Sequence, residues 1–491
     1  MASDNPPAPN VRGWVRLLIV FVVAFDVAAF FQWADGAFQS EFGGHADEAQ
    51  NYFAGLHTRD ALVRTPERAS DGEKFSVASA PDRKWGFSHA LGGWMAVFGA
   101  SRIAVLLFMA ALAAATVTLI FYAVHREHGD WAAAVASLLW LCAPAVRESF
   151  ETILPEQSGA LILTGAALLW ARMVDEGSLR RTAVPKWIGA AALLVLGCIL
   201  TFLIAVSVKA VPGHSRAAGI ILRECVSVLG IAATVFAIVG AVIRPRAEAQ
   251  AGAVRVAMVA LVAGVLVARL VKFAIPDVRV LIVATPALAI LAARGAVALA
   301  GIVGSKAVVP AEVSRRRTLW LFLLLLLALP MDLLHAWQKD WRGFGPAALT
   351  LIEESHGPAR VLVVSDARGE GMFASEMAMR DRERQITVER GSETLAQSVG
   401  GTPGERPEQR FIEDGELLAY LTSGRIRYVV LDSAVPYEGH AGYHDQARRV
   451  LEGNVRNFWP AFDNAIIRDG ELHARALRIF RVMRGDGAEL Q

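Results

Sequence analysis

The chain has 491 residues, of which 54% are hydrophobic and 20% are charged, and its formal net charge at pH 7 is +2. Because so many apolar residues are gathered in long runs, the composition excludes an ordinary soluble protein and indicates a polytopic membrane protein. The near-neutral charge gives no support for nucleic-acid binding. All 3 cysteines lie within apolar runs, so neither a disulfide scaffold nor redox chemistry is expected.

The apolar runs end near residue 336 and predict two domains. About nine runs approach the length of roughly twenty residues that a helix needs to cross a bilayer. They lie at about 14–34, 103–124, 131–147, 157–174, 187–207, 217–243, 253–273, 279–300 and 318–336. The sequence therefore predicts a polytopic α-helical membrane domain over residues 1–336 and a soluble α/β domain over residues 337–491.

Basic residues predict the orientation of the membrane domain. Arg12 and Arg16 precede the first run, which places the N-terminus in the cytoplasm by the positive-inside rule. The expected inside loops are richer in basic residues than the short outside loops. These inside residues are Arg126, Arg172, Arg180, Arg181, Lys186, Arg244, Arg246, Arg255, Lys306 and Arg315–Arg317. We therefore expect the loop at 35–101 and the C-terminal domain on the extracytoplasmic side of the inner (plasma) membrane.

A short apolar stretch interrupts this outer loop between Trp85 and Gly99. It is broken by His89 and by Gly92-Gly93, and it is too short to cross a bilayer. The stretch therefore predicts a helix lying in the membrane interface. Counting it as a span would reverse every later loop and place the arginine-rich loops outside.

The densest group of polar residues, "HADEAQNYFAG", follows the first apolar run and the glycine pair at 43–44. Its pattern is helical, with apolar residues on one face and polar residues on the other. The apolar face holds Ala49, Phe53 and Leu56, and the polar face holds Asp47, Glu48 and Asn51. This arrangement predicts a short helix at the membrane surface that turns a carboxylate pair towards a polar cleft. The alternative is a pair of acidic residues favoured by the helix dipole, followed by a solvated face.

Three further groups of charged residues are expected on the same outer face, at 82–84, 147–156 and 272–279. Each basic residue alone could be an anchor that reaches the membrane interface. Together the groups predict a cleft with carboxylates on one side and cations on the other. Such a cleft suits transfer of a sugar from a polyprenyl phosphate, because cations stabilise the leaving phosphate and a carboxylate takes the proton of the attacking group.

Four stretches resemble the GT-C-fold glycosyltransferases, whose members include protein O-mannosyltransferases and the aminoarabinose transferases of lipid A. The stretches are "HADEAQNYFAG", "RKWGFSHALGGWMAVFGASRIAVLL", "ETILPEQSGALILTGAALLWA" and "KFAIPDVRVLIVATPALAILAA". The resemblance covers about residues 12–336. It implies a GT-C-like fold and an inverting glycosyltransferase that moves a sugar from a polyprenyl-phosphate donor to a glycan, lipid or protein acceptor on the extracytoplasmic face.

The resemblance also implies roles for particular residues. Asp47 matches the catalytic acid of the first loop, with Glu48 beside it, and Glu156 or Glu151 matches the second acidic position. Lys84 and Arg279 fall at the basic positions that face the lipid phosphate. The chain departs from the family at Trp85-Gly86, where aminoarabinose transferases have two prolines, and at Val280, where relatives have tyrosine.

The expected site is built from these positions. Asp47 is the general base, and Glu48 or Glu156 orients the acceptor or a metal. The residues expected to bind substrate are Lys84, Arg279, Lys272, His45, Asn51 and Glu151. Asp47, Glu48 and Glu156 could supply oxygen ligands to a divalent cation such as Mg²⁺ or Mn²⁺, or the basic residues could replace it.

The C-terminal part predicts strands at 359–366, 426–432 and 476–483, and helices at 369–383, 415–422 and 444–455. This alternation indicates a small α/β domain, expected to be structural or to guide the acceptor. "SDARGEG" after the first strand resembles a phosphate-binding loop only weakly, because it lacks both the P-loop lysine and the dinucleotide glycine spacing.

Two other functions compete with the glycosyltransferase. A transporter or flippase of lipid-linked sugars would show repeat symmetry and charged residues in mid-membrane, whereas the acidic groups here lie in expected outer loops and no repeat is present. A non-catalytic membrane scaffold with an outer binding domain would make Asp47 replaceable.

Overall fold

The computed structural model describes residues 11–63, 85–175, 233–243, 252–271, 279–302, 310–334, 339–397, 408–436 and 440–483, except 382 and 384. The chain divides into two compact units. We call Met1–Phe31, Met109–Phe150 and Glu156–Trp337 the helical unit, and Gln32–Phe108, Glu151–Pro155 and Gln338–Gln491 the mixed unit.

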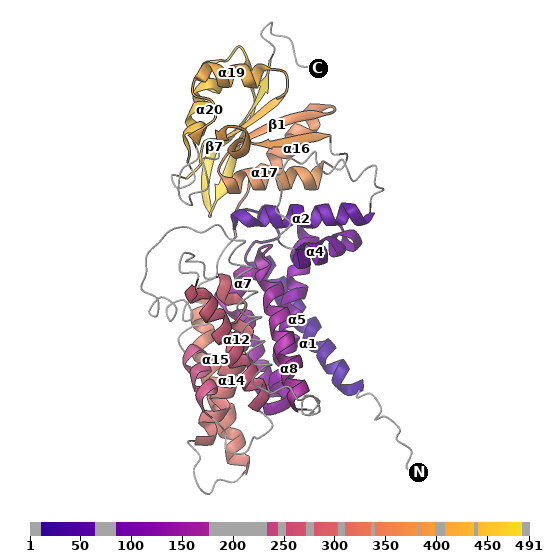
Figure 1. Cartoon of the computed structure of the whole chain (residues 1–491), viewed down its shortest axis with the longest axis vertical. Helices are drawn as coiled ribbons and strands as arrows, with labels where there is room; N and C mark the ends of the chain where they lie inside the picture. The colour runs from indigo at the N-terminus through magenta and orange to yellow at the C-terminus, as the bar shows by residue number, and fades with distance from the viewer. Residues whose placement is uncertain are drawn as a thin grey trace. The chain divides into compact units, whose positions relative to one another are not determined.

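The described part of the helical unit consists mainly of helices, most of them apolar (Figure 1). They are α1 (Val11–Ala34), α5 (Arg102–His128), α6 (Asp130–Cys142), α7 (Pro144–Glu151), α8 (Glu156–Asp175), Ala233–Val242, α12 (Gly252–Val271), α13 (Arg279–Ile282), α14 (Thr285–Ile302) and α15 (Pro310–Leu334). One end each of α1, α5 and α7 extends into the mixed unit. Helix α14 packs against α6 and α15, and α8 packs against α12.

Three helices of the described residues are long and apolar enough to cross a membrane, namely Gly13–Ala34, Arg102–His128 and Glu156–Val174. The pair α6 and α7 makes a fourth if it counts as one span. The predicted total of about nine spans is not confirmed. Two of the expected spans, 187–207 and most of 217–243, lie outside the described residues.

The sequence predicts one span at 131–147, and the structure has two helices there, bent by 64° from each other. The break falls at Ala143, whose ψ of 130° is extended, immediately before Pro144. A proline disfavours helical geometry in the residue before it and lacks the N–H that would continue the helix. The apolar run therefore continues past Pro144, whereas the helix α6 ends before it.

A five-stranded sheet forms the centre of the C-terminal segment of the mixed unit, with strand order β2-β1-β5-β7-β6 (Figure 1). The strands are β1 (Ala359–Val364), β2 (Ile386–Arg390), β5 (Tyr428–Asp432), β6 (Phe458–Arg468) and β7 (Glu471–Val482), and a separate pair is β3 (Ala396–Gln397) with β4 (Glu408–Gln409). Strands β2, β1 and β5 are parallel, whereas β7 and β6 are antiparallel.

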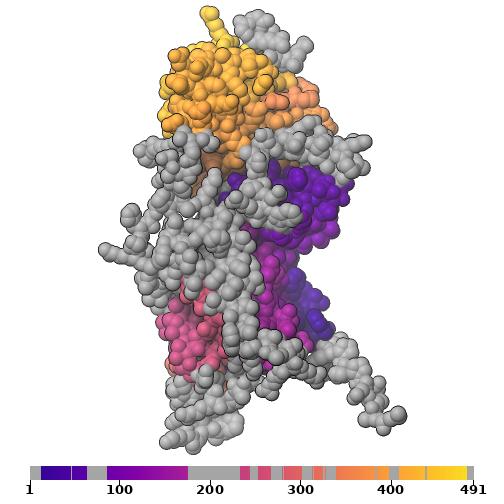
Figure 2. All heavy atoms as spheres, viewed as in Figure 1, coloured from indigo at the N-terminus to yellow at the C-terminus, as the bar shows by residue number. Residues whose placement is uncertain are grey.

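Helices flank this sheet, and its residues form one closely packed body in Figure 2. The helices are α16 (Phe344–Ser355), α17 (Ala367–Arg380), α18 (Gly391–Thr394), α19 (Asp414–Thr422) and α20 (Gly442–Gly453). The predicted strands at 359–366, 426–432 and 476–483 and the three predicted helices are confirmed within a few residues. The sequence did not predict α16, β2 or β6.

Helix α2 (Ala46–Val63) lies between two other helices of the mixed unit, α4 (Trp85–Phe98) and α17 (Figure 1). Glycines allow both contacts. A Cβ on Gly92 of α4 would lie 2.5 Å from Thr58 of α2, and a Cβ on Gly371 of α17 would lie 2.8 Å from Ala49. Helices are predicted from the sequence at both α2 and α4, and the apolar face of α2 is buried as expected.

The first loop and the start of the C-terminal segment are joined by backbone hydrogen bonds. The N–H of Lys339 donates to Asp35 O at 3.0 Å, and the N–H of Glu41 donates to Trp341 O at 2.7 Å. The carboxylate of Glu41 also accepts from the N–H groups of residues 343–345, at the start of α16. Residues that the sequence assigns to two domains thus fold in one compact unit.

Candidate active site

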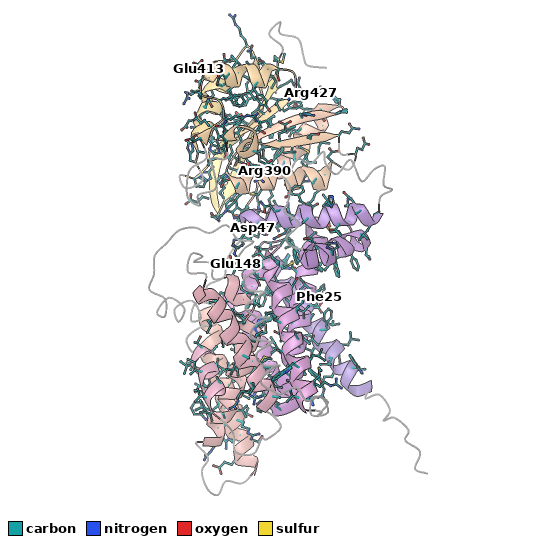
Figure 3. The ribbon with its side chains drawn as sticks, viewed as in Figure 1. Phe25, Asp47, Glu148, Arg390, Glu413 and Arg427 are labelled. Atoms are coloured by element: carbon teal, nitrogen blue, oxygen red, sulfur yellow. The ribbon has the colours of Figure 1, made fainter. Side chains whose placement is uncertain are left out.

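Asp47 and Glu48 occupy the first turn of α2, and Asp47 marks that end of the helix in Figure 3. Carboxylates are favoured at this position because the unpaired N–H groups of the first turn carry a partial positive charge. The side chain of Asp47 is partly exposed, whereas Glu48 is 0% exposed. Two adjacent carboxylates therefore have different environments.

The carboxylate of Glu48 is held by hydrogen-bond donors from three stretches of the chain. Its Oε2 accepts from the N–H of Gly44 at 2.8 Å and of His45 at 3.4 Å. Its Oε1 accepts from the N–H of Ile153 at 3.2 Å and from Nζ of Lys339 at 2.6 Å. Removing one partner of a buried ion pair costs about 3–5 kcal/mol, because it leaves the other charge uncompensated.

Asn51 lies one turn after Glu48 and binds the same segment. Its Nδ2 donates to Ile153 O at 2.6 Å, and Nζ of Lys339 donates to Glu151 O at 3.0 Å. The side chain of Glu151 is buried as well. The start of α2 is thus fixed against residues 151–153 by the side chains of Glu48, Asn51 and Lys339.

The sequence predicts that the polar face of α2 opens onto a cleft, and the structure corrects this for two of its three residues. Glu48 and Asn51 are buried against the 151–153 segment, and only Asp47 keeps partial exposure. The physical reason is that buried donors and acceptors need partners, and the peptide groups of this segment supply them. His45 is also partly exposed beside Asp47.

Two predicted site residues belong to the helical unit, where they start neighbouring helices. Glu156 is buried in the first turn of α8, and the partly buried Arg279 begins α13. Helix α13 packs against α8. The predicted phosphate-binding residues Lys84 and Lys272 lie outside the described residues.

Lys339, the buried cation of this site, was missed by sequence reasoning. A single lysine after an apolar run is usually an anchor at the membrane surface. The one signal available was Glu48 itself, which has no lysine or arginine nearby in the sequence. A buried carboxylate requires a positively charged or hydrogen-bonding partner. That signal does not indicate which of the basic residues supplies it.

A metal bound by Asp47, Glu48 and Glu156 does not fit the donors that the structure shows. Both oxygens of Glu48 are engaged by N–H groups and by the ammonium of Lys339, which repels a second cation. Among the described residues, no three His, Cys, Asp or Glu side chains gather in a way that could hold a metal ion.

The carboxyl group of Glu41, in the same loop as the start of α2, has a raised pKa. Burial and the neighbouring Glu376 raise its pKa to about 7, against the hydrogen bonds that it accepts from the start of α16. Glu376 in turn pairs with Arg102 and with Arg380. A group of two carboxylates and two arginines thus supports the junction between the first loop and the C-terminal segment.

The "SDARGEG" stretch joins β1 to α17 at the carboxyl ends of β1 and β5, where open α/β sheets commonly bind ligands. Here the chain's own groups fill that place. Asp366 accepts from the N–H of Gly369 at 2.9 Å, and the buried Arg468 pairs with both Asp366 and Asp432. The helix start that would bind a phosphate is therefore already capped by a carboxylate.

Comparison with known proteins gives no family for the chain. A scan against protein-family models finds no match, and a search of curated proteins finds no matching sequence.

Proposed function

We propose that the chain is an inverting glycosyltransferase that transfers a sugar from a polyprenyl-phosphate donor, with Asp47 as the general base. The observation that carries this proposal is the contrast between two adjacent carboxylates. Glu48 is fully buried and held by four donors, whereas Asp47 keeps access to solvent in the same first turn of α2. A base fixed in this way is preorganised to meet an acceptor.

The proposed reaction is a single displacement. The acceptor oxygen or nitrogen attacks the anomeric carbon of the sugar, the bond from that carbon to the phosphate oxygen breaks, and Asp47 takes the proton of the acceptor. The leaving group is the polyprenyl phosphate. Arg279, together with Lys84 and Lys272 outside the described residues, is proposed to stabilise its charge.

The surroundings of Asp47 in the sequence support a lipid-linked donor. Helices α1 and α5, two of the candidate membrane spans, stand directly before and after the loop that carries α2 and α4. A donor with a polyprenyl chain stays in the bilayer, so its phosphate can be reached only by residues near the end of a span. The proposal includes a GT-C-like membrane domain, a cytoplasmic N-terminus and an extracytoplasmic site in the inner membrane.

The test is transfer of a radiolabelled sugar from polyprenyl-phosphate donors in membranes that contain wild-type protein or Asp47→Asn at matched expression. Asparagine keeps the shape of the side chain and removes the base. We expect transfer by the wild type and a loss of about a hundredfold or more in the variant. Asp414→Asn is the matched control, because Asp414 is an exposed carboxylate in the first turn of another helix, α19.

Undiminished transfer by Asp47→Asn would reject Asp47 as the base. Absence of transfer by the wild type with every donor tried would favour the transporter or the scaffold.

A further inference from the structure

Lys339 joins stretches of chain that are far apart in the sequence. Its side chain is fully buried, and its backbone N–H binds Asp35 O. Its Nζ lies 2.6 Å from Oε1 of Glu48 and 3.0 Å from Glu151 O, and 5.9 Å from the centre of the Phe42 ring. A residue at the start of the C-terminal segment thus supplies the cation for the first turn of α2.

The same oxygen of Glu48 serves two donors, Nζ of Lys339 and the N–H of Ile153. Without the ammonium, a negative charge on Glu48 would be buried among backbone amides alone. Losing one partner of a buried ion pair leaves the other charge uncompensated, which favours movement of the side chain towards water. When it moves, it releases Ile153, and the contact between α2 and residues 151–153 loosens.

We infer that Lys339 is a positioning residue for Asp47. By holding Glu48, it keeps the first turn of α2 in the geometry from which Asp47 takes the proton of the acceptor. Asp47 directly precedes Glu48, so a displacement of Glu48 displaces the base. Because Asp47 is the base only in the proposed function, this role of Lys339 rests on that function.

A positioning role predicts a lower kcat at nearly constant KM, and rescue when the charge of residue 48 is removed together with that of Lys339. In Lys339→Met, the buried carboxylate of Glu48 is left without its cation. In Glu48→Gln/Lys339→Met, residue 48 carries no charge, and the carbonyl oxygen of the glutamine can still accept from the N–H of Ile153.

The experiment measures kcat and KM of sugar transfer for the full-length protein in lipid nanodiscs. Rates are normalised to the amount of folded protein, measured by size-exclusion chromatography. The proteins are the wild type, Lys339→Met, the double variant Glu48→Gln/Lys339→Met, and Arg360→Met. Arg360 is the control, since it also pairs with a glutamate, Glu389, but is exposed on β1.

We expect kcat of Lys339→Met to fall by about tenfold to a hundredfold, with KM within about twofold of the wild type. The double variant should recover most of kcat, because the carbonyl oxygen of the glutamine can still accept from the N–H of Ile153 and no buried charge is left without a cation. Arg360→Met should behave as the wild type. If Lys339→Met does not fold, Lys339→Arg takes its place, with a lower kcat and a KM close to that of the wild type.

Three results would overturn the role of Lys339. The first is an unchanged kcat per folded molecule in Lys339→Met, or in Lys339→Arg where that variant replaces it. The second is a raised KM at constant kcat, which would make Lys339 a substrate-binding residue. The third is a double variant as impaired as Lys339→Met. If the wild type transfers no sugar, or Asp47→Asn remains active, the proposed function fails and the role of Lys339 fails with it.

Discussion

Nζ of Lys339 and Oε1 of Glu48 lie 2.6 Å apart, although 291 positions separate the two residues in the sequence. The first loop and the C-terminal segment are held together by this ion pair. Hydrogen bonds between Asp35 or Glu41 and residues 339–345 add to it. The residues beyond the apolar runs are therefore needed to complete the surroundings of Asp47. Other contacts of the same unit lead to predictions about its stability.

The stability of the mixed unit should fall as the pH rises from about 4.5 to about 7. Burial raises the pKa of both Glu41 and Glu370 to about 7, with Glu376 adding to the effect at Glu41. A carboxyl group whose pKa is higher in the folded state stabilises the fold fully below its unfolded pKa, and this contribution is lost as the pH passes through the folded value.

Thermal unfolding followed by tryptophan fluorescence tests this prediction. We expect Tm at pH 8 to be lower than at pH 5.5 by about 3 °C or more, and Glu41→Gln to reduce the difference. A Tm that rises steadily between these two pH values would contradict it.

The glycine pair on α4 should respond asymmetrically to alanine. A Cβ on Gly92 would lie 2.8 Å from Gly55 O of α2 as well as against Thr58, whereas a Cβ on Gly93 would meet nothing within 4 Å. Gly92→Ala should destabilise the protein by about 1–3 kcal/mol, because the helices must separate. Gly93→Ala should be neutral or stabilise the helix by up to about 1 kcal/mol.

Chemical denaturation of the two variants in the same detergent measures this difference. Equal stabilities for Gly92→Ala and Gly93→Ala would show that α2 and α4 do not pack as closely as described.

Arg468 should be far more important for stability than a surface arginine on the adjacent strand. Its guanidinium is buried between Asp366 and Asp432. Burial alone would raise the pKa of Asp366, but the charge of Arg468 and the N–H of Gly369 lower it. Arg468→Met leaves two uncompensated carboxylates and should cost about 3–5 kcal/mol.

The matched control is Arg478→Met, since Arg478 on β7 pairs with Glu452 at the surface and such pairs contribute about 1 kcal/mol or less. Denaturation midpoints of the two variants give the comparison. A loss for Arg468→Met no greater than that for Arg478→Met would rule out the buried ion-pair network as a main source of stability.

Local patterns in the sequence determined the elements of this protein. Helical spacing predicted α2 with Ala49, Phe53 and Leu56 inward, and runs of apolar residues predicted β1 and β5. Pro144 carried the signal for the break between α6 and α7, since the effect of a proline acts on its immediate neighbours. These features depend on residues a few positions apart, and a sequence displays such spacing directly.

Only the tertiary structure decided which polar groups meet. The spacing of Asp47, Glu48 and Asn51 placed them on one face of a helix. It did not show whether that face is buried, because burial of a charged residue depends on partners that are distant in the sequence. Glu48 is buried because Lys339 and Ile153 compensate it, and the place where the sheet could bind a ligand is filled because Arg468 reaches it from β6. Hydrophobic periodicity records which side of an element avoids water, whereas the pairing of buried charges depends on how distant segments of the chain come together.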